Sequence, residues 1–206
     1  MKYFSLMILF ILFSCGKKEA VLLPKSNVSL VKNVEDHSPI YIFFRTKEND
    51  TLAEVNRKNS IISTNWILNI DKRLPLRLVI PEIMKLQEKK REEKAHKNEA
   101  AQNYYSYADS VGKNLAFIPF TDVYYKTEQP KAGIVILFTK NNEIKVAKEF
   151  VRKEKLKQYL AALAVDSKAN HVFCFDKEMS FGNYIQHKIF LESLGIQRNS
   201  TEEFIF

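Results

Sequence analysis

The chain has 206 residues, with 32 Lys and Arg against 24 Asp and Glu, which gives a formal charge of +8 at pH 7. Its five glycines form no glycine-rich phosphate loop, and its two cysteines, one of them in an N-terminal apolar run, do not suggest a structural disulfide. A basic surface favours anionic partners such as membranes, cell-wall polymers or nucleic acid.

The N-terminal run follows a single lysine and stays apolar from Phe4 to Phe13. It is about half of the roughly 20 residues that a membrane-spanning helix needs, so we expect no span here. A basic start, a short apolar centre and a small residue before a cleavage site are typical of a secretory signal peptide. Residues 12–15, "LFSC", resemble a bacterial lipobox, in which the cysteine, here Cys15, receives a diacylglyceryl group and becomes the new N-terminus.

We therefore expect residues 1–14 to be a cleaved signal peptide and residues 15–37 to be a lipid-anchored tether that could add an edge strand. The alternative is a signal-peptide thiol that is discarded. Several acyl chains, palmitate among them, would hold the protein stably on the cell membrane or outer membrane, facing the periplasm. Gly16 after the cysteine resembles an outer-membrane sorting signal, and residues 17–19, "KKE", resemble a surface-export signal. Export also argues against nucleic acid as a partner.

Three elements recur in the same order in the two halves of the mature chain: an apolar strand, a strand leading through Asp-Lys into a helix, and a short aromatic strand. They are "PIYIFF" (39–44), "ILNIDKRLPL" (67–76) and "LAFIPF" (115–120), then "GIVILF" (133–138), "VFCFDKEMSF" (172–181) and "EEFIF" (202–206). The repeat reflects either duplication or the shared physics of sheets packed by helices. Both explanations predict an α+β fold with helices on one face of each sheet, in two similar units, 38–127 and 131–206.

Each half also has an insertion that the other lacks. In the second half, apolar residues at i, i+3, i+4 and i+7 predict a helical face formed by Leu156, Tyr159, Leu160 and Leu163. In the first half, residues 86–103 extend the helix with charges on nearly all sides, so we expect this extension to lie outside the core. The charge run Lys85–Lys97 is typical of a solvated helix with i, i+4 pairs; a protruding arm that contacts a partner is the alternative.

Residues 133–206 resemble the periplasmic domain of the ExbD/TolR family, and residues 39–120 echo it more loosely. In that resemblance, residues 133–150 are a strand and hairpin, "KEKLKQYLAAL" is a first helix, residues 169–196 are a strand, loop and second helix, and "EEFIF" is the last strand. The family pattern of an aspartate with a charged neighbour, an inward-facing helix residue and a glycine at the helix end is matched by Asp176, Lys177, Tyr184 and Gly195.

The resemblance implies only part of the family's work. Family members carry a membrane helix with an aspartate that takes part in proton flow, whereas this chain has no acidic residue before Glu19. What remains implied is a non-enzymatic accessory protein that binds an envelope protein, a cell-wall polymer or another copy of the fold. The two halves could also form a covalent version of the family's homodimer. The alternative is a secreted hydrolase or a glycan-binding lipoprotein.

The candidate partner-binding residues are aromatic. Tyr104, Tyr105 and Tyr107 are expected beside a turn, where exposed tyrosines could stack on sugars or anchor a partner, unless they pack beneath the charged helix. Phe204 and Phe206 lie in the C-terminal strand, which we expect to be an exposed sheet edge open to strand addition.

No catalytic, metal or cofactor site is predicted. The four histidines show no paired ligand spacing, and no Gly-x-Ser-x-Gly motif occurs. Cys174, in the apolar run "HVFCFD", is expected to be a core residue.

Overall fold

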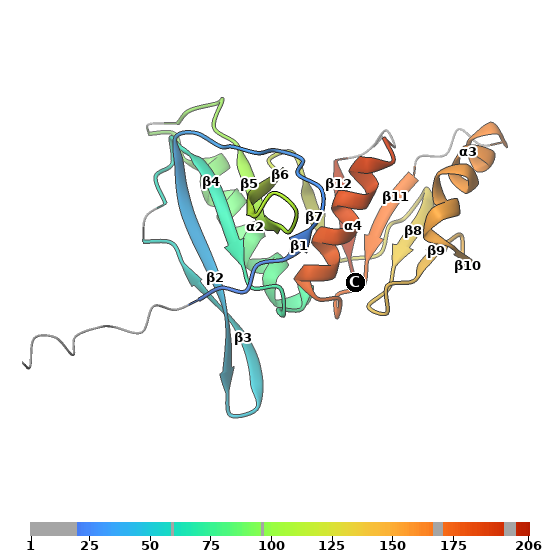
Figure 1. Cartoon of the computed structure of the whole chain (residues 1–206), viewed down its shortest axis with the longest axis horizontal. Helices are drawn as coiled ribbons and strands as arrows, with labels where there is room; N and C mark the ends of the chain where they lie inside the picture. The colour runs from blue at the N-terminus through green and yellow to red at the C-terminus, as the bar shows by residue number, and fades with distance from the viewer. Residues whose placement is uncertain (1–19, 59, 96, 167–170, 196–200) are drawn as a thin grey trace, which may run out of the picture.

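The computed structural model of the protein describes residues 20–206 except 59, 96, 167–170 and 196–200. These residues form two six-stranded mixed sheets with three α-helices, which confirms the predicted α+β class with two sheet-plus-helix units (Figure 1). The predicted signal peptide and the lipid-attachment residue Cys15 lie outside the described residues.

The first sheet is built from a hairpin and two parallel strands. β2 and β3 pair antiparallel, β4 pairs parallel with β2, and β5 pairs parallel with β4, while β6 and β1 flank β5. The hairpin extends beyond the rest of the sheet (Figure 1). The bounds are β1 (Lys25–Ser26), β2 (His37–Lys47), β3 (Asp50–Asn56), β4 (Asn65–Ile70), α2 (Leu76–Glu92), β5 (Asn103–Asp109) and β6 (Asn114–Pro119).

The second sheet repeats this arrangement. β8 and β9 form a hairpin that β10 extends, and β11 and β12 follow in parallel beside β8. The strand order is β10-β9-β8-β11-β12-β7. The bounds are β7 (Tyr124–Lys126), β8 (Ile134–Phe138), β9 (Ile144–Val146), β10 (Glu149–Val151), the 3₁₀ helix η1 (Lys153–Lys155), α3 (Leu156–Asp166), β11 (His171–Phe175), α4 (Phe181–Ser193) and β12 (Glu202–Ile205).

The internal repeat is present in the order of the strands, but one predicted match is wrong. β5 is parallel to β4 as β12 is parallel to β11, so the counterpart of β12 is β5. The predicted counterpart, residues 115–120, mostly forms β6, which runs antiparallel to β5. The match was wrong because it was based on composition. "LAFIPF" is apolar and aromatic like "EEFIF", whereas β5 is rich in tyrosine and serine.

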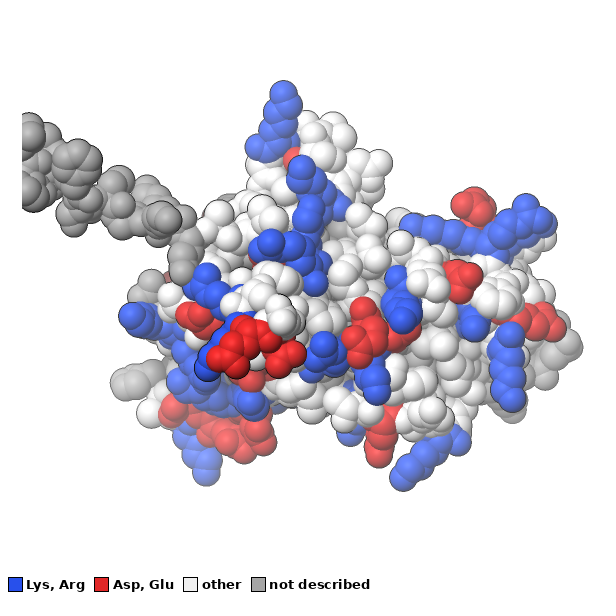
Figure 2. All heavy atoms as spheres, turned by 90° about the horizontal axis from the view of Figure 1, so that it is seen from below, with Lys and Arg blue, Asp and Glu red and all other residues white. Residues whose placement is uncertain are grey.

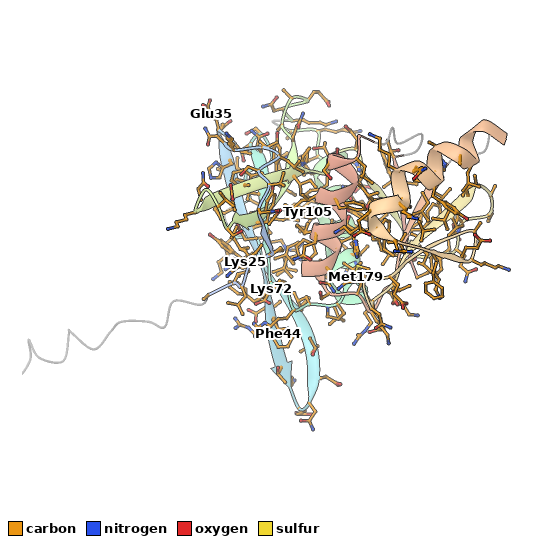
Figure 3. All side chains as sticks on the ribbon, turned by 45° about the vertical axis from the view of Figure 1, so that its right-hand side comes forward. Lys25, Glu35, Phe44, Lys72, Tyr105 and Met179 are labelled. Atoms are coloured by element: carbon orange, nitrogen blue, oxygen red, sulfur yellow. The ribbon has the colours of Figure 1, made fainter. Side chains whose placement is uncertain are left out.

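The two halves meet at the segments that join each Asp-Lys to its helix. Leu76 N–H donates to the carbonyl of Met179, and Phe181 N–H donates to the carbonyl of Leu74. A second pair of bonds runs from Arg77 to Lys177 and from Gly182 to Lys72. Each bond has its mirror in the other half, so the contact has an approximate two-fold symmetry centred on the bridge between Pro75 and Ser180. Lys72 and Met179 mark the two segments in Figure 3.

One continuous apolar cluster joins the two sheets. It includes Ile40 and Ile42 of the first sheet, Ile136 and Phe138 of the second, and the inner faces of all three helices. Leu156 and Leu160 of α3 are buried in it, with Tyr159 and Leu163 partly buried against it, which confirms the predicted helical face.

Two segments lie elsewhere than the predicted boundaries suggest. Residues 20–36 pack on the first sheet: Lys72 N–H donates to the carbonyl of Leu22, and Val34 is buried. They are therefore part of the folded body, and only residues 15–19 of the predicted tether precede them. β7 lies within the predicted first unit, 38–127, but pairs with β12 of the second sheet.

Helix α2 extends into the charged run, but it is shorter than predicted. The helix ends at Glu92, and three residues expected to be solvated, Leu86, Gln87 and Lys90, are buried. The Lys90 ammonium donates to the carbonyls of Thr64 and Gln102 and lies over the Trp66 ring. Burial lowers the Lys90 pKa to about 8. The prediction missed this because a long lysine stem can pack like an apolar residue when acceptors meet its ammonium.

Candidate functional site

The structure places the predicted partner-binding residues in three different environments. Tyr105 and Tyr107 are fully buried, so the prediction that they reach a partner is wrong. Tyr104 is half-buried on the opposite face of β5. Phe204 and Phe206 come together on the outer face of the second sheet, the face away from the helices.

The C-terminal strand is not a sheet edge, which corrects the second prediction. β12 lies between β11 and β7 and pairs in parallel with both. Its inward side chains, Glu203 and Ile205, are buried. A partner can reach this strand only from the outer face. Deleting residues 203–206 would remove an interior strand, so we expect it to disrupt the fold as well as any binding.

Tyr105 belongs to a buried chain of polar groups between the two halves. Its hydroxyl lies 2.6 Å from the Tyr125 hydroxyl, which lies 3.1 Å from that of Tyr184. Tyr184 donates to Glu203 Oε2 at 2.6 Å, and Lys188 donates to Glu203 Oε1. In Figure 3, Tyr105 lies within the body of the molecule near α4. These contacts connect β5, β7, α4 and β12.

The electrostatics of this chain favour a structural role. Burial, followed by the nearby ionisable groups, raises the pKa of Tyr105, Tyr125 and Tyr184 well above the usual value. The hydroxyls are therefore neutral at physiological pH and act as hydrogen-bond donors and acceptors. A satisfied buried polar chain of this kind specifies how two packed layers align.

The outer face of the second sheet is the candidate functional site. Because side chains alternate along a strand, the register between strands places one row of side chains across all six strands on this face. The row consists of Phe150, Lys145, Leu137, Cys174, Phe204 and Lys126. Val135 and Val172 stand opposite each other in the next row on the same face. The face is thus apolar at its centre and carries a lysine on each side.

A single segment crosses this face. Residues 127–133 run from β7 to the start of β8, and all of them are exposed except Pro130, which is half-buried. Two hollows of about 610 Å³ each lie beside the segment and share Gln129, Pro130 and Gly133 as lining residues. Val172 and Phe204 form the apolar floor of the first hollow.

The second hollow, which we call the outer groove, is lined by the apolar residues Val135, Leu137 and Phe206 together with Lys145 and Lys148. No acidic residue is among its lining residues within the described chain. Its floor is apolar and its charged wall is basic.

The first sheet shows how such a face can be closed. There, residues 31–36 cross the outer face from β6 to β2, and Val34, only 6% exposed, packs against Ile67 and Phe117. Ile67 and Val172 occupy matching positions, because each is the residue four before its Asp-Lys pair. Residues 127–133 bury no apolar side chain completely on the second sheet, yet Val172, Cys174 and Phe204 are at most 9% exposed there. The apolar side chains of this face that stay half-buried are Val135, Leu137 and Phe206.

Lysine side chains border the outer face, together with Glu128 and Glu202 beside the first hollow. The Lys145 ammonium lies 4.6 Å from the ring centroid of Phe150, which is 67% exposed. Lys126 forms an ion pair of 3.6 Å with Glu202 at the opposite border. Lys and Arg side chains are also spread along the face of the molecule seen in Figure 2, with acidic groups between them. The open face therefore suits a ligand with both apolar and anionic parts.

The remaining candidates for chemistry have structural environments. Burial raises the pKa of the Cys174 thiol to about 12, so the thiolate needed for nucleophilic attack is scarce at neutral pH. Among the described residues, no group of three or more His, Cys, Asp and Glu side chains could hold a metal ion. In the same part of the chain, no helix is long and apolar enough to cross a membrane.

The sequence did carry a signal for the open face. The runs "GIVILF", "HVFCF" and "EEFIF" are apolar at successive positions, which is typical of strands covered on both faces. The helices cover only one of these faces. The shortage of covering residues could not be read from the sequence, because it depends on the path of residues 127–133.

Comparisons with known proteins found no match: no family model, no curated protein and no solved structure matches the chain.

Proposed function

We propose that this protein is a lipid-anchored binding or accessory protein of the bacterial cell envelope. It resembles the periplasmic part of the ExbD/TolR transport-energising proteins and lacks their proton-conducting membrane helix. The lipid on Cys15 attaches it to a membrane, and the folded body binds an envelope protein or a cell-wall polymer. The observation that carries the binding role is the outer face of the second sheet, where the half-buried Leu137 and Phe206 line a groove and Phe150 is exposed.

The order of elements in the second half supports the resemblance. A strand and hairpin (β8 to β10), a first helix (α3), a strand and second helix (β11 and α4) and a last strand (β12) follow one another as that pattern requires. Tyr184 is buried and Gly195 adopts a φ of +60° just after α4, a conformation that glycine accepts readily. The pseudo-two-fold contact between the halves agrees with a covalent version of a homodimer.

The lining of the two hollows favours binding over hydrolysis. Neither hollow is lined by His, Ser, Cys or Asp among the described residues, so neither offers a nucleophile with an adjacent base. Apolar side chains bordered by lysines suit the docking of a partner.

Crosslinking in intact cells tests this proposal. The full chain with a C-terminal tag is crosslinked, purified and analysed for captured proteins and polymers, beside a Cys15→Ala variant that cannot be lipidated. We expect the wild type to fractionate with membranes and to capture envelope components, and the variant to lose membrane attachment. A wild-type protein that remains soluble, or that captures only components of another compartment, would contradict the proposal.

A further inference from the structure

The outer groove has a chemistry that specifies its partner more closely. We propose that it binds an extended, acidic segment of a partner protein, whose apolar side chains contact Val135, Leu137 and Phe206 and whose carboxylates pair with Lys145 and Lys148. This inference rests on the proposed binding function and names the class of partner for that same face.

The protein contains its own example of an extended segment on such a face. On the first sheet, residues 31–36 lie across the strands and are fixed by two backbone bonds between Val31 and Phe117. Val34 fills the space between this segment and the sheet. A strand-like segment with one inserted apolar side chain therefore closes an outer face of this fold. On the second sheet the half-buried Val135, Leu137 and Phe206 line the outer groove beside residues 129–133.

Charge determines the second requirement for the partner. Lys145 and Lys148 project from the β9 end of the groove, and no carboxylate lines it among the described residues. An uncharged segment would form no ion pair with these ammonium groups, and a basic segment would be repelled by them. Asp or Glu would form ion pairs with them that are partly shielded from water. Phe150 lies beside Lys145 and adds an exposed ring to which an apolar partner residue can pack.

The size of the groove fits a short segment. A volume of about 610 Å³ accommodates a few side chains, and its open shape admits a backbone that enters and leaves along the face. Since the area is small, we expect affinity in the micromolar range and dependence on salt, because ion pairs at a solvated rim weaken as ionic strength rises.

Selection of peptides tests the inference. A display library of random 12-residue peptides is selected against the folded protein, immobilised through its tag. The enriched peptides are synthesised, and their binding to the protein is measured by fluorescence anisotropy. We expect enriched sequences to combine Asp or Glu with Val, Leu, Ile or Phe. The variant Lys145→Glu with Lys148→Glu should weaken their binding at least tenfold.

A matched control separates the groove from net charge. The variant Lys47→Glu with Lys157→Glu changes the charge by the same amount at two exposed positions, on the hairpin and on α3, and should bind as the wild type does. Circular dichroism verifies that both variants fold. A neutral variant, Lys145→Gln with Lys148→Gln, should give an intermediate affinity if ion pairs are responsible.

Three results would overturn the inference. They are enrichment of peptides without acidic residues, equal binding by the two charge-reversed variants, and occupation of the groove by something else. Oleate binding that the groove variant abolishes, with no peptide selected, would assign the groove to a lipid. A dimer that only the groove variant disrupts would assign it to a second copy of the chain.

The same variants distinguish failure of this inference from failure of the proposed function. If cells expressing the groove variant still crosslink to the same envelope components, the inference is wrong and the envelope role stands. If selected peptides bind the groove but no envelope component is captured in cells, the groove stands and the envelope role is wrong.

Discussion

His187 should make the protein lose stability as the pH falls. The residue lies on α4 with 4% of its surface exposed, and its ring centroid is 4.7 Å from that of Phe138. Neither ring nitrogen has a hydrogen-bond partner among the described residues. Burial, with a smaller contribution from Lys153, lowers the His187 pKa from 6.5 to about 4. The folded protein therefore holds this histidine neutral.

The lowered pKa has a definite consequence for stability. Because the folded pKa lies below the unfolded one, the unfolded chain binds the proton first as the pH falls through 6.5. The stability present at pH 7 is then lost progressively down to the folded pKa, near pH 4. At about 1.4 kcal/mol per pH unit, the loss between pH 7 and pH 4 amounts to about 3 kcal/mol. This is a large share of the ~5–15 kcal/mol that stabilises a typical domain.

Urea unfolding at several pH values measures this loss. The only tryptophan, Trp66, is buried and reports unfolding by its fluorescence. The variant His187→Phe keeps an aromatic ring beside Phe138 and cannot be protonated, so its stability should fall by about 3 kcal/mol less than that of the wild type between pH 7 and pH 4. Equal pH dependence of wild type and His187→Phe would show that burial of His187 does not destabilise the protein at low pH.

Other predictions concern the contact between the halves and the N-terminal segment. Lys188→Met should cost about 3–5 kcal/mol, because it removes the ammonium from the buried Glu203, and adding Glu203→Gln should recover part of this loss in urea unfolding. Tyr105→Phe should cost about 1–3 kcal/mol because its hydroxyl is buried and bonded, whereas Tyr104→Phe, whose hydroxyl bond is exposed, should cost less than about 0.5 kcal/mol. Deleting residues 20–34 should lower the thermal midpoint because Val34 and Leu22 anchor that segment; an unchanged midpoint would restore the tether interpretation. Light scattering should find a concentration-independent monomer, since the pseudo-two-fold contact is already made within one chain, and a tight dimer would count against that account.

Much of the fold could be predicted because long apolar runs and helical spacing are local signals. The apolar runs "PIYIFF" and "GIVILF" predicted strands that the structure has as β2 and β8, and the spacing of Leu156 and Leu160 predicted the helix α3. The match of residues 115–120 to β12 failed because strand pairing is not local: β5 is identified by its parallel pairing with β4, not by its composition. The same limit applies to β7, which leaves its own half to pair with β12.

The candidate site was only partly predictable. Phe204 and Phe206 were predicted at an exposed sheet edge; they lie instead on the outer face of an interior strand, with Phe204 only 9% exposed, and their role in binding stays a prediction. The sequence cannot distinguish Tyr104 from Tyr105, because consecutive strand residues point to opposite faces and only the register decides which face is covered. Lys145 in β9 and Lys148 in the turn that follows were missed as well, because their place beside the groove depends on the alignment of β9 with β8.

Site-specific photocrosslinking on the outer face can show whether this face binds a partner in the envelope. A photoreactive amino acid replaces Phe150, at the border of the outer groove, in the lipidated protein in intact cells, and a second protein carries it at Asn49 on the exposed hairpin turn. We predict that position 150 crosslinks to an envelope protein through an acidic segment that mass spectrometry can map, and that position 49 does not. Crosslinks of the same kind and yield from both positions, or none from position 150, would contradict the claim that this face binds the partner.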